Sequence, residues 1–285
     1  MEYKKPAGYL IVLAAILLAQ SCTDELDLSG LIYSPDNANE RYEESGEWNL
    51  HNPKQEIIVA SDNYTFLVAG DPHVGHTKNL DHFIKKATAP EISFFILAGD
   101  LTTGQSYDYD TLYKHLTGLA LLPYFLTVGN HDLFFDGWKS YHDYFGSATY
   151  TFTVESLSGR DLYICIDTGT GTLGSKQMQW LKETLKNTRN NYRNCIIITH
   201  VNFFREHRTA STNLLVEELY TLLDLFADNR VDVVIMGHDH RRSVEIFGQT
   251  HYITLDALED EFDDASYLSV TNKKGTVSYK FIDVD

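Results

Sequence analysis

Residues 124–132 read Tyr-Phe-Leu-Thr-Val-Gly-Asn-His-Asp, an apolar run that ends in a glycine and a group of polar side chains. Four other stretches have the same form; they are 64–73 (YTFLVAGDPH), 94–100 (FFILAGD), 195–200 (CIIITH) and 231–240 (VDVVIMGHDH). Continuous hydrophobic runs of this kind are typical of buried parallel strands. Open α/β sheets bind ligands outside the carboxyl ends of their strands, so we expect the polar side chains to converge on one rim of one sheet.

The polar residues that follow these runs are of the types that bind metals. The oxygen donors are Asp71, Asp100 and Asn130, and the imidazoles are those of His73, His131, His200, His238 and His240. A mixture of oxygen and imidazole ligands suits Zn, Mn or Fe better than Mg or Ca. The sequence therefore predicts a metal site, and the number of donors favours two metals.

Helical and strand-like segments alternate along the rest of the chain. Helices are expected over 78–89, 106–119, 177–187 and 213–226, with a short helix ending at 145. Strands are expected over 148–154, 161–167, 243–247, 250–255, 265–270 and 276–284. The alternation predicts helices that cover a largely parallel sheet, and the β-rich second half implies a second sheet. The expected fold class is α/β, a two-sheet β-sandwich core flanked by helices on both sides.

Length and charge limit the classes of partner. With 285 residues, one large domain with short extensions is the simplest organisation. The formal net charge of −17 and the lack of a basic stripe disfavour long nucleic acids and anionic membrane surfaces. A small phosphate ester is compatible with this charge because bound metal ions reverse its sign locally. The sequence does not indicate an oligomeric state.

The N-terminus has the pattern of an export signal. Lys4 and Lys5 precede an apolar segment, 9–19, that is short for a membrane span. The segment leads into Ser21-Cys22, which resembles the cleavage site of bacterial lipoproteins. We expect residues 1–21 to be a signal peptide and Cys22 to carry the lipid that anchors an exported protein in a bacterial cell envelope. The alternative is an ordinary cleaved signal peptide with an incidental cysteine.

Residues 22–55 are polar and acidic and are interpreted as a lipidated tether, leaving 56–285 as the domain. The alternative is that part of this stretch packs on the domain, which Trp48 makes plausible for its last few residues. Cys165 and Cys195 lie within apolar strand-like runs and are interpreted as buried thiols. A disulfide between them stays open, because export would permit one.

The ordered set Asp-x-His, Gly-Asp, Gly-Asn-His-Asp, His and Gly-His-x-His resembles the calcineurin-like metallophosphoesterase superfamily. The resemblance covers roughly 60–260, and Gly174, Gln177, Trp180 and Leu181 are similar to a helix start in that family. It implies a four-layer αββα fold and two divalent metal ions, with Mn, Zn or Fe left open. It also implies that Asp71, His73 and His240 bind one metal, that Asn130, His200 and His238 bind the other, and that Asp100 bridges both.

The resemblance further implies hydrolysis of a phosphate ester by a hydroxide between the two metals, whose binding brings the pKa of water near neutrality. His131 is the residue that would act near the leaving-group oxygen. In the protein-phosphatase branch an aspartate orients this histidine, but Thr103 stands at that position here, and Asp132 is not an assured replacement. The arginine of that branch and the extra tyrosine ligand of purple acid phosphatases are also absent.

We therefore expect a phosphoric ester hydrolase that acts on a phosphodiester or a small phosphomonoester. The alternatives are a nuclease of the same superfamily and a non-catalytic surface lipoprotein on the same fold. Arg205, His207 and Arg208 follow the His200 strand and either bind substrate phosphate or form a solvated loop. Asp239, between two candidate ligands, is interpreted as a residue that supports them rather than as a ligand.

Overall fold

The computed structural model describes residues 35–52, 55–119, 122–205 and 213–284. The signal peptide expected over 1–21, the lipidated Cys22, and His207 and Arg208 lie outside these residues. Within them, no helix combines the length and the hydropathy required to cross a membrane.

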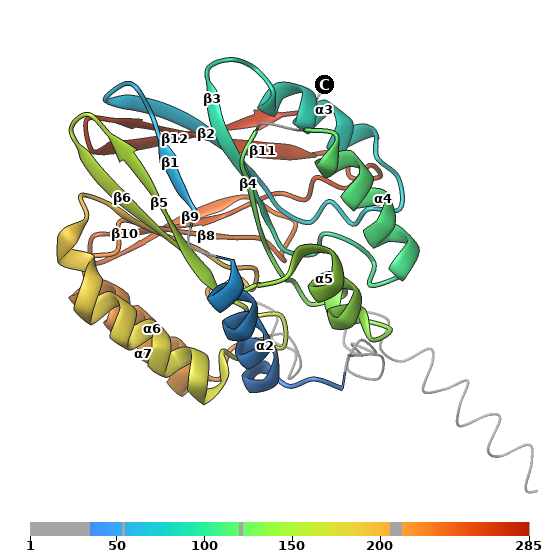
Figure 1. Cartoon of the computed structure of the whole chain (residues 1–285), viewed down its shortest axis with the longest axis horizontal. Helices are drawn as coiled ribbons and strands as arrows, with labels where there is room; N and C mark the ends of the chain where they lie inside the picture. Colours follow the sequence, from blue (N-terminus) through green and yellow to red (C-terminus); the bar gives the residue numbers. More distant parts are fainter. Residues whose placement is uncertain (1–34, 53–54, 120–121, 206–212, 285) are drawn as a thin grey trace, which may run out of the picture.

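Two β-sheets form the centre of the described structure (Figure 1). One is five-stranded, in the order β12 (Thr276–Asp283), β11 (Ser266–Lys273), β2 (Asn63–Ala69), β3 (Ile92–Ala98), β4 (Tyr124–Thr127). The other is seven-stranded, in the order β1 (Glu56–Ile58), β5 (Tyr150–Ser156), β6 (Gly159–Cys165), β7 (Cys195–Ile198), β8 (Val233–Met236), β10 (Thr250–Thr254), β9 (Ser243–Phe247). β2, β3 and β4 run parallel, and so do β6, β7 and β8.

The two inner faces of the sheets pack through aromatic side chains. Phe66 and Phe94 stack with their ring centroids 4.7 Å apart, and Phe94 meets the edge of Phe152 on the opposite sheet at 5.7 Å. All three rings are fully buried. Aromatic pairs in these geometries stabilise a core beyond the area that they bury, so this layer fixes the distance and orientation of the two sheets.

Helices cover both outer faces. α3 (Lys78–Ala87), α4 (Ser106–Thr117) and α5 (Gly137–Phe145) bury Phe83, Leu112 and Trp138 in the core outside the five-stranded sheet. α6 (Gly174–Thr188) and α7 (Val216–Asp228) bury Leu181 and Phe226 outside the seven-stranded sheet. Figure 1 shows the two helical groups on opposite sides of the sheets. The expected two-sheet α/β sandwich with helices on both sides is confirmed.

The tether prediction is wrong for its last part. α2 (Ala38–His51) is a helix that packs on the domain between α5 and α6 (Figure 1). Asn37 accepts hydrogen bonds from the backbone of Asn39 and Glu40, and Glu40 accepts one from the backbone N–H of Asn37, a capping box that starts the helix. The Arg41 side chain is fully buried against Asp167, which the acidic composition of the stretch did not suggest.

Candidate metal centre

The five polar stretches meet at one place, but they come from both sheets. Asp71, Asp100 and Asn130 follow β2, β3 and β4 of the five-stranded sheet, whereas His200 and His238 follow β7 and β8 of the seven-stranded sheet. The expectation of one rim of one sheet is therefore wrong. The carboxyl ends of the parallel strands in both sheets lie at the same end of the sandwich, so the centre spans the gap between them.

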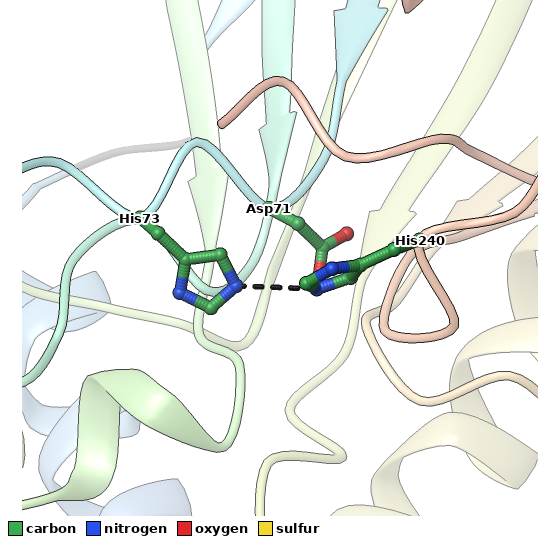
Figure 2. A group of neighbouring side chains, drawn as sticks. All are labelled: Asp71, His73 and His240. Atoms are coloured by element: carbon green, nitrogen blue, oxygen red, sulfur yellow. Dashed lines mark hydrogen bonds and ion pairs between the residues drawn. The ribbon is translucent and has the colours of Figure 1, made fainter. Parts of the chain in front are cut away.

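One group of candidate ligands comprises Asp71, His73 and His240. Figure 2 shows the three side chains pointing toward one another, Asp71 and His73 from the loop after β2 and His240 from the loop after β8. The Nε2 atoms of His73 and His240 are 3.2 Å apart, and His240 Nε2 is 3.3 Å from Asp71 Oδ1. Asp71 is fully buried and also accepts the backbone N–H of His238, at 3.0 Å from Oδ2. That hydrogen bond ties the β2 loop to the β8 loop.

A second group comprises Asp100, His200 and His238, and Asn130 adjoins it. His200 Nε2 lies 3.2 Å from Asp100 Oδ2, 3.1 Å from Asn130 Oδ1 and 3.2 Å from His238 Nδ1. The His200 Nδ1–H donates to the carbonyl of Ala98 at 3.0 Å. This bond places the proton on Nδ1 and leaves Nε2 directed into the group.

Asp100 connects the two groups through a single oxygen. Its Oδ2 is 3.7 Å from His73 Nε2 and 3.2 Å from His200 Nε2. Its other oxygen, Oδ1, accepts the backbone N–H of His131 at 2.7 Å. The structure thus brings all seven predicted ligand residues together, with Asp100 close to both His73 and His200.

The oxygen and nitrogen atoms that could bind a metal lie close to one another, and this arrangement requires a positive charge among them. With its proton on Nδ1, neutral His200 presents the Nε2 lone pair to the Asp100 carboxylate oxygen and to the Asn130 amide oxygen. Burial alone would lower the pKa of His200, but the nearby Asp100 and Asp71 carboxylates raise it to about 10. Without a metal, a proton on Nε2 supplies that charge. A divalent cation would replace the proton, because metals bind the deprotonated form of their ligands. The residues present therefore fit metal ions.

The other pKa shifts in the centre also come from burial and from neighbouring charges. Burial alone would raise the pKa of Asp100, but the charges of His200 and His131 lower it well below its usual value. Burial, reinforced by His200, lowers the pKa of His238 to about 3. Burial likewise lowers the pKa of His73. The carboxylate is therefore ionised and both imidazoles are neutral at physiological pH, which is the state in which each can bind a metal.

The backbone at the centre is strained. Asp71, Asp100 and His238 have φ values of 52°, 48° and 78°, in the left-handed region that non-glycine residues rarely adopt. Such residues cost on the order of 1–3 kcal/mol each and persist where the surrounding structure holds them. Gly99 has φ of 83°, and a Cβ at that position would lie 2.6 Å from His200 Nδ1. Glycine is therefore needed where the loop passes the imidazole.

Asp132 holds two of the ligand loops together, a role that the sequence did not reveal. It is fully buried and accepts the backbone N–H groups of Gly129, Leu101 and Thr102 at 2.9–3.0 Å. Burial, together with the charge of Asp100, raises the pKa of Asp132 to about 7. Asp132 thus fixes the β3 loop to the β4 loop, whereas the backbone N–H of His131 donates to Asp100.

His131 is not one of the seven predicted ligands, but it forms a third group of possible metal-ligating residues with His73 and Asp100. It is at the start of the short helix η2 (His131–Leu133), half-buried, with its ring centroid 4.6 Å from that of His73 and 4.6 Å from that of Phe134. Thr103 does not orient it, because the Thr103 hydroxyl donates to Asp108 at 2.5 Å. The ring is held by aromatic packing instead.

Arg205 and Asp239 form the border of the second group. The Arg205 Nη1–H donates to His238 Nε2 at 2.7 Å, and Arg205 Nε is 2.9 Å from Asp239 Oδ1. Asp239 also accepts a hydrogen bond from the Asn202 amide at 2.8 Å, so it supports the loop that carries His238 and His240. The ion pair with Asp239 holds the Arg205 guanidinium next to the candidate metal centre.

Comparison with known proteins gives one sequence match and several structural ones. The sequence model of the calcineurin-like phosphoesterase family matches residues 64–242. No curated protein matches the chain. GAP50 of Plasmodium, described as the anchor in the inner membrane complex, superposes with a TM-score of 0.62 at 16% identity, covering 78% of this chain and 84% of its own.

A dimetal phosphatase from Danio rerio superposes with a TM-score of 0.55 at 12% identity, over 78% of this chain and 99% of its own. A candidate 5′-nucleotidase from Staphylococcus aureus, solved with α-ketoglutarate, gives a TM-score of 0.56 at 16% identity, over 78% of this chain and 54% of its own. At these identities the structural matches establish the fold, and the sequence match extends over all seven candidate ligands and His131.

Proposed function

Because the chain belongs to the calcineurin-like phosphoesterase family, we propose that it hydrolyses phosphate esters at a centre of two divalent metal ions. The observation that carries this proposal is the convergence of possible metal-ligating atoms around His200 Nε2 and at the Nε2 atoms of His73 and His240. Mn, Zn and Fe suit such mixed oxygen and imidazole donors.

We propose two ligand sets. Asp71, His73 and His240 would hold one ion, and Asn130, His200 and His238 the other; Asp100 would serve both through Oδ2. Bound ions would activate water and neutralise charge on the phosphoryl oxygens. The chain itself fixes the ligands: the Ala98 carbonyl sets the His200 tautomer, and the His131 N–H holds Asp100 Oδ1 away from the shared position.

His131 is proposed to donate the proton to the leaving-group oxygen. Its ring adjoins that of His73 and it is half-buried, so it borders both the ligands and solvent. A positioned imidazole that transfers a proton in the transition state contributes about 10²–10⁴-fold to the rate. The packing of His131 between His73 and Phe134 supports this role by limiting the orientations of its ring.

The proposed substrate is a phosphodiester or a small phosphomonoester. The charge of −17 disfavours long nucleic acids, which argues against the nuclease alternative. Arg205 is the nearest described arginine contact of the centre, and a guanidinium binds phosphoryl oxygens with two parallel donors. We propose that it contributes to substrate binding.

The site of action is proposed to be the bacterial cell envelope, with the chain anchored through a lipid on Cys22. The support is the sequence pattern of residues 1–22. The position of α2 shortens the proposed tether, because the domain begins with that helix rather than at residue 56. Fatty-acid labelling that is lost in Cys22→Ala would support the anchor, and labelling that persists would contradict it.

The enzyme proposal is tested with metal-depleted protein, assayed on bis- and mono-nitrophenyl phosphate before and after addition of Mn²⁺ or Zn²⁺. We expect turnover of at least one ester after metal addition and its loss in Asp100→Asn. If neither ester is cleaved with any metal, the non-catalytic alternative is the better account of this fold.

A further inference from the structure

A cavity of about 590 Å³ lies between α2, the end of α5, β4 and the start of β5. None of the seven candidate ligands is among its described lining residues. Its volume is in the range of sites that bind small molecules. The phosphoesterase proposal makes no use of it.

The chemistry of the lining is distinctive. Aromatic rings of Tyr42, Trp48, Tyr124, Tyr144 and Trp180 line it together with neutral polar side chains, including Asn49 and Asn52. No described lining residue is Asp, Glu, Lys, Arg or His, although 22% of the chain is charged. The described part of the lining therefore offers rings, amides and hydroxyls, without a charged side chain among them.

This combination suits one class of ligand. A phosphate or carboxylate group would lose its hydration with no described cation to pair with it, and an acyl chain would cover the polar part of the lining with apolar groups. A sugar ring has both surfaces that the cavity needs: C–H faces that pack on aromatic rings and hydroxyls that exchange hydrogen bonds with amides. We propose that the cavity binds a neutral carbohydrate, a mono- or disaccharide.

Parts of the wall are held in place by bonds within the protein. The Tyr150 hydroxyl donates to the Leu126 carbonyl at 2.7 Å and accepts a hydrogen bond from the Leu126 backbone N–H at 2.9 Å. These two bonds satisfy the backbone polar groups of Leu126 on the edge strand β4. The Asn49 amide donates to the Thr149 carbonyl at 2.8 Å and is thereby oriented. A preformed site loses little freedom when a ligand binds, which favours binding of a small sugar.

The position of the Trp48 indole depends on the glycine at residue 146. Gly146 has φ of 78°, and its missing side chain leaves room for the indole, whose atoms would collide with a Cβ there. The indole also meets the edge of the His142 ring at a centroid distance of 5.9 Å. One aromatic wall of the cavity is thus fixed by a residue, Gly146, that lies outside it.

The test uses the full chain and a glycan array that carries neutral and anionic saccharides, followed by tryptophan fluorescence titration with the neutral saccharide that binds best. Two of the three tryptophans, Trp48 and Trp180, line the cavity, so binding should change the emission. Tyr144→Ala and Asn52→Ala should each weaken binding at least about tenfold, which corresponds to about 1.4 kcal/mol. Asp100→Asn should bind the sugar as the unaltered chain does.

Three results would overturn the proposal: an array on which no neutral saccharide binds, a preference for anionic glycans, or affinity unchanged in both cavity variants. Asn52 is exposed, so its replacement tests the site even if Tyr144→Ala does not fold. Hydrolysis of nitrophenyl phosphates in Tyr144→Ala and Asn52→Ala should stay at the level of the unaltered protein. The sugar site and the metal centre are thus tested separately.

Discussion

Arg41 Nε lies 2.7 Å from Asp167 Oδ2, and both side chains are almost completely buried. The same guanidinium donates to the Asp36 carbonyl at 2.7 Å and to the Thr170 hydroxyl at 3.1 Å. The pair joins α2 to the segment after β6, where the Thr168 hydroxyl accepts the backbone N–H of Val201 at 3.0 Å, next to His200. Helix α2 lies outside the residues that the family model matches, yet it is part of the domain.

Replacement of Arg41 should destabilise the protein strongly. Arg41→Met leaves Asp167 buried without its charged partner, and breaking a buried pair in this way costs about 3–5 kcal/mol. A matched control exists between the same helix and α6, where Lys176 pairs with Glu43 on the surface. Lys176→Met should cost below about 1 kcal/mol. Urea unfolding measures the free energy of unfolding of both variants. Equal decreases in the two variants would contradict a larger contribution of the buried pair to stability.

Arg205→Gln should weaken substrate binding. Loss of a charge-assisted hydrogen bond of about 1.5–3 kcal/mol predicts a KM higher by about 10- to 100-fold. Arg241→Gln is the control, since Arg241 is exposed and lies one residue beyond His240. Steady-state kinetics on a nitrophenyl phosphate separates KM from kcat. An unchanged KM in Arg205→Gln would remove this residue from substrate binding.

His131 and Thr103 should differ sharply in their effect on catalysis. His131→Asn should lower kcat by about 10²–10⁴-fold if the imidazole donates the leaving-group proton. Thr103→Ala should leave kcat within about twofold, because its hydroxyl is bonded to Asp108 and not to His131. The loss in His131→Asn should be smaller for an ester whose leaving group needs no proton, such as a nitrophenolate. Equal losses on good and poor leaving groups would contradict the acid role.

Cys165 and Cys195 should be unreactive thiols in the folded protein. Both are free and fully buried, and burial raises the pKa of each to about 12. Since a raised pKa keeps the thiol neutral, neither should react with iodoacetamide at pH 8. In Cys22→Ala protein, unfolding without reductant should expose two alkylation sites by mass spectrometry. A disulfide would leave both unlabelled.

The sequence predicted much of the fold because the strand runs are long, apolar and followed by polar residues. It placed β9 at 243–247, as observed, and found the four helices α3, α4, α6 and α7 within a few residues of their ends. It did not show that the strand ends belong to two sheets. Periodicity describes which face of a strand is buried, but the pairing of β7 and β8 in another sheet depends on contacts far apart in the chain.

Two other features needed the structure. α2 has an acidic, polar sequence without the apolar stripe that marks an amphipathic helix, and Arg41 is among the side chains that it buries. The feature of the sequence that indicates the start of this helix is the Asn37–Glu40 capping box. Asp132 follows His131 directly, and the sequence left open whether it orients that histidine. Its side chain instead binds backbone N–H groups of another loop, and adjacency in sequence does not reveal that direction.

The central claim is a centre of two metal ions that share Asp100. The most direct measurement is the metal content of the purified protein by inductively coupled plasma mass spectrometry after loading with Mn²⁺ or Zn²⁺ and removal of excess ion. The account predicts two ions per chain, about one in His240→Ala and in His238→Ala, and a loss of both in Asp100→Ala. A chain that folds normally but retains no ion, or an Asp100→Ala variant that still binds two, would contradict it.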